Sequence, residues 1–323
     1  MRWLKRIGYG AAALALVAAI ALIVFRTPDT DPAAMRAKYG GPPSQFVELG
    51  GGLTVHLRDT GPRDAPVLML LHGSNDSLHA WEDWAERLDK RYRVIRYDQI
   101  GHGLTGPNPT GDYTIAAFVD MVERVRTKLG VDHIVLAGNS MGGGVALHYA
   151  VQHPEHVAGL ILVDSAGARL PADRVPALVF RIAATPVLGN LATIITPRSV
   201  VEGGLSSAFS DQALVTDALI DRGWELLRYP GNRAATIARF ATPDVPLTAA
   251  QFAALRLPVL IQWGANDQAI PLQSGKWLNA HIPGSTLAVY PGTGHVPMEE
   301  AADASAADAY RFIEARVMPG LKP

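Results

Sequence analysis

The sequence predicts an α/β protein built on a mainly parallel β-sheet with helices on both faces. Along most of the 323 residues, short apolar runs rich in Val, Ile and Leu alternate with amphipathic stretches of helical spacing. Strands that are apolar on both faces are typical of parallel sheets covered by helices on each side. A chain of this length can bury one large core, with an insertion, as readily as it can form two domains.

Eight strands are expected, and the first two are joined through three consecutive glycines, which favours an antiparallel hairpin there. The expected strands cover residues 45–49, 53–58, 66–71, 92–97, 133–137, 157–163, 258–263 and 285–290. Helical spacing predicts helices at residues 79–90, 115–129, 145–150, 272–281 and 299–317.

One long stretch interrupts the alternation of strands and helices. Between residues 163 and 258 the patterns are helical and are divided by prolines, and no good strand is found. In an open α/β sheet such an insertion emerges at the carboxyl edge, over the crevice where ligands bind. We therefore expect a core formed by residues 45–166 and 251–323, with residues 167–250 forming a helical lid.

The N-terminus is expected to be a separate segment. An uncharged run over residues 7–25 follows three positive charges and is about long enough to cross a ~30 Å hydrocarbon layer as a helix. Residues 1–26 therefore predict an inner-membrane anchor with the catalytic part exported, so that the membrane is an expected partner. A cleaved signal peptide, giving a secreted or periplasmic protein, is the alternative, because residues 19–21 offer an A-x-A pattern. Residues 27–44 are expected to be a linker.

Composition and missing motifs exclude several functions. The net charge of −1 offers no basic field for nucleic acid, and the absence of cysteine excludes disulfides and thiolate chemistry. Residues 101–106 match G-x-G-x-x-G, but Pro107 and Pro109 prevent a helix from opening there, so no dinucleotide site is predicted. No cofactor and no metal are expected. The sequence carries no signal for oligomeric state.

The most informative segment of the chain is residues 135–144. An apolar run leads into the G-x-S-x-G pattern of residues 138–142, and a helix-forming run follows. The glycines permit a sharp strand-to-helix turn that presents the Ser140 hydroxyl near the positive end of the helix. Ser140 is therefore the predicted nucleophile, and Asn139 and Met141 are expected to lie beside the substrate.

Two late loops offer the partners that a serine nucleophile needs. His295 lies in a glycine-rich turn after the last strand, and Asp267 follows the strand before it. An imidazole can take the hydroxyl proton while a carboxylate fixes its tautomer, so His295 is the predicted base and Asp267 the predicted orienting acid. Asp164, directly after another strand, is the alternative acid.

The oxyanion of a tetrahedral intermediate needs backbone N–H donors. Met141 follows the nucleophile, and its N–H lies at a helix N-terminus. The loop after an earlier strand supplies the second donor, for which Ser74 is predicted and Asn75 is the alternative. Asn75 is also expected to bind substrate, whereas His72 is expected to make a structural hydrogen bond.

Five motifs, in the same order along the chain, resemble the α/β-hydrolase superfamily. They span most of the chain, from about residue 46 to residue 317. The motifs are residues 72–73, 98–103, 138–143, 264–267 and 294–297. This resemblance implies the α/β-hydrolase fold with a helical lid, a serine triad in the chain order Ser, Asp, His, and no cofactor. It also implies Asp164 as the alternative orienting acid, because some members of the superfamily place the acid after the strand that corresponds to residues 157–163.

The segment around the serine is similar to those of carbon–carbon bond hydrolases acting on ring-cleavage products and of many carboxylesterases. The carbon–carbon hydrolases usually carry a run of glycines followed by Pro-Gly after the first histidine, and an aromatic residue after the catalytic one. This chain has Ser74-Asn75-Asp76 and Val296 at those places. We therefore predict hydrolysis of a small carboxylic ester or lactone through an acyl-serine intermediate. A carbon–carbon bond hydrolase of diketones and a non-catalytic ligand-binding receptor are the alternatives.

Overall fold

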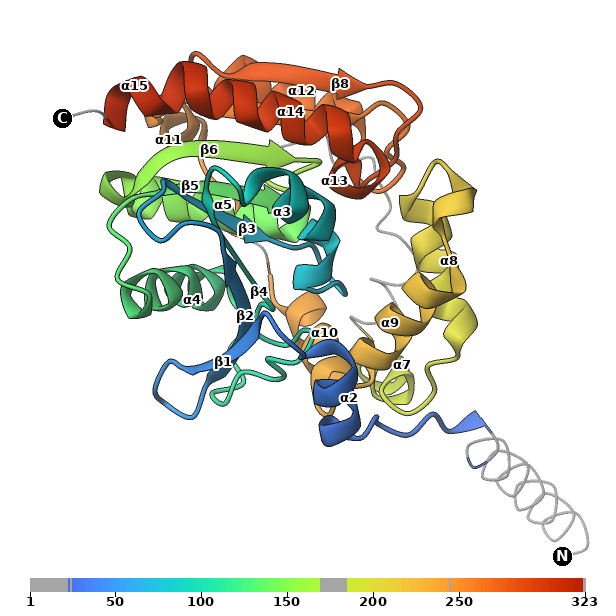
Figure 1. Ribbon diagram of the computed structural model, residues 1–323. Helices are drawn as coiled ribbons and strands as arrows, with labels where there is room; N and C mark the ends of the chain where they lie inside the picture. The colour runs from blue at the N-terminus through green and yellow to red at the C-terminus, as the bar shows by residue number, and fades with distance from the viewer. Residues whose placement is uncertain (1–22, 24, 169–184, 244, 322–323) are drawn as a thin grey trace, which may run out of the picture.

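The computed structural model describes residues 23, 25–168, 185–243 and 245–321 (Figure 1). Its strands are β1 (Ser44–Glu48), β2 (Thr54–Thr60), β3 (Val67–Leu71), β4 (Arg93–Tyr97), β5 (Ile134–Asn139), β6 (Val157–Val163), β7 (Val259–Gly264) and β8 (Thr286–Tyr290). They form one sheet in the order β1-β2-β4-β3-β5-β6-β7-β8. β2 pairs antiparallel with both neighbours, and the strands from β4 to β8 pair in parallel. The predicted fold class is confirmed.

The two faces of the sheet are covered by different helices. Leu68 and Leu70 of β3 lie in one core cluster with residues of α3 (Glu82–Leu88) and α14 (Ala302–Phe312). The alternate residues of β3 lie in the other cluster with residues of α4 (Ile115–Lys128), α5 (Met141–Gln152) and α12 (Leu272–His281). Successive side chains of a strand point to opposite faces, so one apolar strand serves both cores. This two-sided burial explains why its sequence is continuously apolar.

In its described residues, the insertion between β6 and β7 contains four helices that form a cap. They are α7 (Pro186–Ala192), α8 (Arg198–Ala208), α9 (Asp217–Leu227) and α10 (Asn232–Ala241). Figure 1 shows the arrowheads of β6 and β8 directed toward the side on which the cap lies. A fifth helix, α11 (Ala249–Ala254), leads back to the sheet and contacts α12. Residues 169–184 and 244 of the predicted lid lie outside the described residues.

The remaining elements are short. The 3₁₀ turns are η1 (Leu78–Trp81), η2 (Pro154–His156) and η3 (Gln212–Leu214), and η4 (Ile313–Val317) is a π-helical turn. The short helices are α2 (Pro32–Tyr39), α13 (Pro297–Glu300) and α15 (Met318–Leu321). The predicted C-terminal helix over residues 299–317 is therefore divided at Ala301, which separates α13 from α14.

The N-terminal part of the described chain is attached to the cap. Arg233 of α10 binds Asp29 through Nη2 at 2.6 Å and the carbonyl of Thr27 through Nη1 at 2.8 Å. Lys38 and Tyr39, at the end of α2, both donate to the carboxylate of Glu225 in α9. The range predicted as a linker thus contains a helix, and its contacts hold it against the cap helices.

The predicted localisation requires a correction. Within the described ranges, no helix is long and apolar enough to cross a membrane, which contradicts an inner-membrane anchor with an exported catalytic part. The run over residues 7–25 that carried this prediction lies outside the described residues, apart from Ile23 and Phe25.

Candidate active site

Ser140 occupies a strained turn between β5 and α5. Its backbone has φ 53° and ψ −118°, in a region that residues with a side chain rarely adopt. A Cβ on Gly138 would lie 2.3 Å from the carbonyl oxygen of Gly142, and a Cβ on Gly142 would lie 2.4 Å from that of Leu71. The glycines of the G-x-S-x-G pattern are therefore required by close backbone contacts. They allow the turn that places Ser140 directly before the N-terminus of α5.

His295 and Asp267 form a hydrogen-bonded pair at the ends of β8 and β7. The distance from His295 Nδ1 to Asp267 Oδ2 is 2.8 Å. The other carboxylate oxygen of Asp267 accepts the N–H groups of Ala269 and Ile270 at 2.7 and 2.9 Å. An imidazole that donates from Nδ1 has Nε2 as its proton acceptor. These contacts support His295 as the base and Asp267 as its orienting acid.

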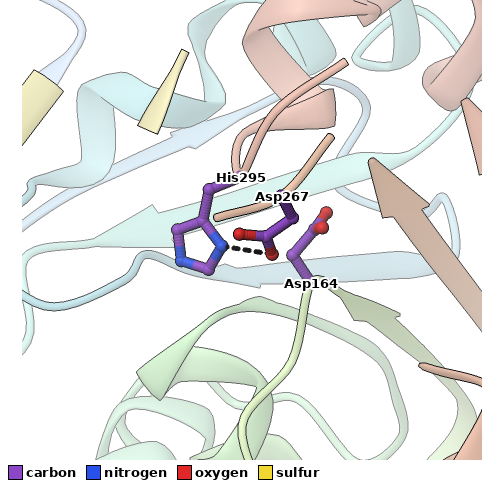
Figure 2. Close-up of side chains that lie close together, drawn as sticks. All are labelled: Asp164, Asp267 and His295. Carbon is purple, nitrogen blue, oxygen red and sulfur yellow. Dashed lines mark hydrogen bonds and ion pairs between the residues drawn. The ribbon is translucent and has the colours of Figure 1, made fainter. Parts of the chain in front are cut away.

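The alternative acid, Asp164, lies next to this pair (Figure 2). One carboxyl oxygen of Asp164, one of Asp267 and one ring nitrogen of His295 all lie within 4.8 Å of one another. Asp164 Oδ1 accepts the N–H of Gly264 at 3.0 Å, and the residue is fully buried. Burial and the nearby charge of Asp267 raise the pKa of Asp164 well above its usual value. Both candidate acids thus lie at one place, and Asp267 is the one bonded to His295.

This cluster also has the ligand types that divalent metals bind. In the part of the chain that the structure describes, it is the one group of three such side chains that lie close enough together to hold a single metal ion. Three of its four carboxylate oxygens already accept hydrogen bonds, two on Asp267 and one on Asp164. These hydrogen bonds therefore fit a carboxylate that orients a histidine better than they fit a metal site.

The loop after β3 lies against the serine turn. A Cβ on Gly73 would lie 3.2 Å from the Cβ of Ser140, so the glycine permits this approach. Ser74, the predicted oxyanion donor, follows directly and is partly exposed. Met141, the other predicted donor, is buried as the first residue of α5. This arrangement supports a pair of backbone donors on either side of the serine.

Two other residues of that loop have defined contacts. Asn75 has φ 60° and is exposed, and its Oδ1 accepts the hydroxyl of Thr236 from α10 at 3.0 Å. The expected substrate-binding residue therefore lies where the loop meets the cap. His72 is fully buried, its Nδ1 lies 2.7 Å from the carbonyl of Gly73, and its Nε2 accepts the N–H of Gln99 at 3.0 Å. Both ring nitrogens of His72 thus hold the loop.

Asn139 links the serine turn to the histidine loop. Its amide Nδ2 donates to the carbonyl of Val163 at 3.2 Å and to the carbonyl of His295 at 3.0 Å. The residue is 2 % exposed, and its Oδ1 lies beside Gly73. The sequence led us to expect a substrate contact from Asn139. Its contacts instead favour a role in positioning His295.

Sequence reasoning missed the cap segment over residues 208–211, which begins at the last residue of α8. The N–H of His295 donates to the carbonyl of Ala208 at 2.7 Å, and Asn266 Nδ2 donates to Ser210 Oγ at 2.8 Å. The carboxylate of Glu300 accepts the N–H groups of Gly294 and Asp211. The loops that carry the predicted acid and base are therefore bonded to the cap. No local motif marks these residues, since each contact joins distant segments.

The fold and this site identify the family. The chain matches the model of the alpha/beta hydrolase fold family over residues 66–302, and it belongs to that family. The matched range begins just before β3 and ends at the start of α14, so it includes the serine turn, the cap and both late loops.

Three proteins that this chain resembles are named as hydrolases of specific small molecules. The chain is 31% identical over 270 residues to the 2-hydroxymuconate semialdehyde hydrolase of Pseudomonas sp. strain CF600, covering 81% of this chain and 90% of that protein. It is 28% identical to the 2-hydroxy-6-oxo-6-phenylhexa-2,4-dienoate hydrolase of Burkholderia cepacia, covering 81% and 93%. A meta-cleavage product hydrolase from Pseudomonas fluorescens IP01, solved in complex with acetates, superposes with a TM-score of 0.72. That structure is 25% identical, covering 84% of this chain and 97% of the other.

Proposed function

We propose that the protein is a serine hydrolase that cleaves a carbon–carbon bond in a 2-hydroxy-6-oxo-dienoate. The observation that carries the catalytic part is the His295–Asp267 hydrogen bond beside the glycine-flanked turn of Ser140. The relatives named above support the substrate class, since their names specify substrates of this kind. Ester hydrolysis, which the sequence favoured, becomes the second candidate.

In the proposed reaction, Ser140 and His295 act together on the 6-oxo carbon. His295 Nε2 takes the hydroxyl proton as Oγ of Ser140 adds to the carbonyl, and Asp267 stabilises the imidazolium through Nδ1. The N–H groups of Met141 and Ser74 would hold the oxyanion. The substrate reacts as its 2,6-dioxo tautomer, in which the 2-hydroxyl proton has moved to C5. When the carbonyl at C6 re-forms, the bond between C5 and C6 breaks, its electron pair passes through the C3–C4 double bond to the 2-oxo oxygen, and that oxygen receives the proton held by His295. Water then hydrolyses the acyl-serine, so one water is consumed and a carboxylic acid is released.

The same residues can hydrolyse an ester, and one observation favours that candidate. Val296, directly after His295, is 6 % exposed and packs into the core cluster that contains α14. It therefore offers no aromatic face to a dienoate, in contrast to the pattern expected for carbon–carbon hydrolases. In ester hydrolysis the leaving group is an alkoxide that His295 protonates, and every other step is unchanged.

We further propose that the cap over residues 167–250 closes the substrate-binding side of the core formed by residues 45–166 and 251–323. The support for this is the pair of bonds that join Ala208 and Ser210 to the two loops that carry the acid and base. In addition, the N–H of Asp211 donates to Glu300, whose carboxylate also accepts the N–H of Gly294 in the base loop. A small molecule bound between cap and core would be shielded from water, which strengthens electrostatic interactions at the reacting centre.

A two-substrate comparison tests this proposal. The wild-type protein is assayed with a 2-hydroxy-6-oxo-dienoate, followed by loss of its dienol absorbance, and with a short p-nitrophenyl ester. We expect a kcat/KM for the dienoate at least about tenfold above that for the ester. The reverse ratio would support an esterase. Stoichiometric binding of the dienoate without turnover of either compound would instead indicate a non-catalytic receptor.

A further inference from the structure

The carboxyl group of Asp164 lies beside the Asp267–His295 pair and has no part in the reaction proposed above (Figure 2). It comes directly after β6, at a backbone φ of 42° that disfavours any residue with a side chain. Its Oδ1 accepts the N–H of Gly264, but no donor among the described residues reaches its buried Oδ2. A buried carboxylate oxygen without a donor is destabilising, which calls for an explanation.

The arrangement of donors shows which of the two acids holds a negative charge. Asp267 accepts three hydrogen bonds, from Ala269, Ile270 and the ring of His295, whereas Asp164 accepts one. Two buried carboxyl groups this close cannot both ionise easily, and the charge goes to the one with more donors. Burial, the charge of Asp267 and that of Glu300 all raise the pKa of Asp164. A proton on Oδ2 turns the unpaired acceptor into a donor, and the acceptor it can reach is Asp267, one oxygen of which lies within 4.8 Å of an Asp164 oxygen.

We propose that Asp164 is a neutral carboxylic acid that donates a hydrogen bond to Asp267 and serves as a reserve orienting acid for His295 when Asp267 is absent. This inference rests on the proposed function, because it assigns Asp164 as a positioning residue of the same site. It differs from the alternative considered from the sequence, in which Asp164 replaces Asp267 in the native protein.

Each part of the proposal has a structural consequence. While Asp267 is present, an amide that replaces the carboxyl group of Asp164 can still donate to Asp267, whereas an aliphatic side chain of similar size cannot. When Asp267 is truncated, its charge no longer opposes ionisation of Asp164, which releases its proton to solvent. In the wild-type structure one carboxyl oxygen of Asp164 already lies within 4.8 Å of a ring nitrogen of His295. It can then accept the Nδ1 proton, directly or through a water molecule in the vacated space.

A double-mutant cycle on kcat tests the reserve role. With the substrate that the wild type turns over, we expect Asp164→Asn to lower kcat about threefold, and Asp164→Val about thirtyfold, because it removes the donor. Asp267→Ala should lower kcat about 10²-fold, less than the loss of about 10⁴-fold expected without a substitute acid. The double variant Asp164→Asn/Asp267→Ala should reach that larger loss. A double variant no worse than the product of the two single effects would overturn the reserve role.

A measurement on the wild-type protein tests the protonation state without any turnover. In protein labelled with carboxyl-¹³C aspartate, the Asp164 signal is assigned through the Gly264 amide that donates to it. We expect the chemical shift of a protonated acid at neutral pH, moving to that of a carboxylate in Asp267→Ala. An ionised Asp164 in the wild type would overturn the proposal. This measurement requires no substrate. Failure of the proposed function is recognised by a different result, namely a Ser140→Ala variant that is as active as the wild type.

Discussion

Asn139 donates a hydrogen bond from its side-chain amide to the backbone carbonyl of His295 across 3.0 Å. The residue before the predicted nucleophile thus holds the loop of the predicted base, although 156 positions separate the two. The same amide bonds to Val163 at the end of β6. The serine turn, the base loop and β6 are therefore fixed relative to one another through one buried side chain.

Removal of this side chain should impair turnover more than substrate binding. We expect Asn139→Ala to lower kcat about tenfold with a small change in KM, because His295 loses a positional constraint. The lost bonds should also lower the free energy of unfolding by about 1–3 kcal/mol. Steady-state kinetics and urea unfolding measure the two effects. An unchanged kcat with a raised KM would instead favour the substrate contact expected from the sequence.

The glycines of the serine turn should be intolerant of a methyl group. Gly142→Ala would place a Cβ 2.4 Å from the carbonyl oxygen of Leu71, so we expect a loss of about 3 kcal/mol in the free energy of unfolding. Gly203 in α8 is the matched control, because nothing lies within 4 Å of a Cβ placed there. Gly203→Ala should stabilise the protein by about 0.5–1 kcal/mol through helix propensity. Similar effects at both positions would contradict the close packing described for the turn.

Glu300 should couple the base loop to the cap. Glu300→Ala leaves the N–H groups of Gly294 and Asp211 without their carboxylate acceptor, so we expect kcat to fall about tenfold. The backbone amides of residues 208–211 should also exchange hydrogen faster. Asp303→Ala is the control, since its side chain is 93% exposed and its ion pair with Arg87 lies at the surface. Equal amide exchange in Glu300→Ala and wild type would refute the coupling.

His102 should make stability depend on pH in a defined window. Burial lowers the pKa of His102 to about 3, and its Nδ1 donates to the carbonyl of Ile100. The unfolded chain, with a pKa near 6.5, binds a proton that the folded protein excludes, so stability rises with pH. This stability is complete above pH about 6.5 and is lost as the pH falls toward 3.

Comparison with His102→Asn isolates this contribution. Between pH about 6 and 3, the unfolding free energy of the wild type should fall more steeply than that of the variant, by about 1.4 kcal/mol per pH unit. Urea unfolding at several pH values measures both slopes. Parallel slopes would show that His102 carries its proton in the folded state.

The strands could be predicted closely because each satisfies a local rule. Buried parallel strands are continuous apolar runs, so β3, predicted as residues 66–71, forms over Val67–Leu71. Helix α5 was predicted only over residues 145–150, because the glycines at its start have low helix propensity. In the structure α5 begins at Met141, where close packing against the end of β3 requires Gly142.

The residues proposed for catalysis carried motifs, but the residues that hold them in place did not. Ser140, Asp267 and His295 could be proposed because each lies in a recognisable turn after a strand. The contacts of Asn139 and Glu300, and the proximity of Asp164 to Asp267, join segments that are far apart in the sequence. No local pattern reports such contacts, so they became visible when the strands were placed side by side.

The most direct test of the account is the turnover number of Ser140→Ala with the substrate that the wild type hydrolyses. The variant is first shown to fold by comparing its near-ultraviolet circular dichroism with that of the wild type. We predict a loss of at least about 10⁴-fold in kcat, because addition to the carbonyl has no substitute nucleophile of equal strength. A folded Ser140→Ala variant that retains a kcat within about tenfold of wild type would contradict the assignment of Ser140, and the proposed mechanism with it.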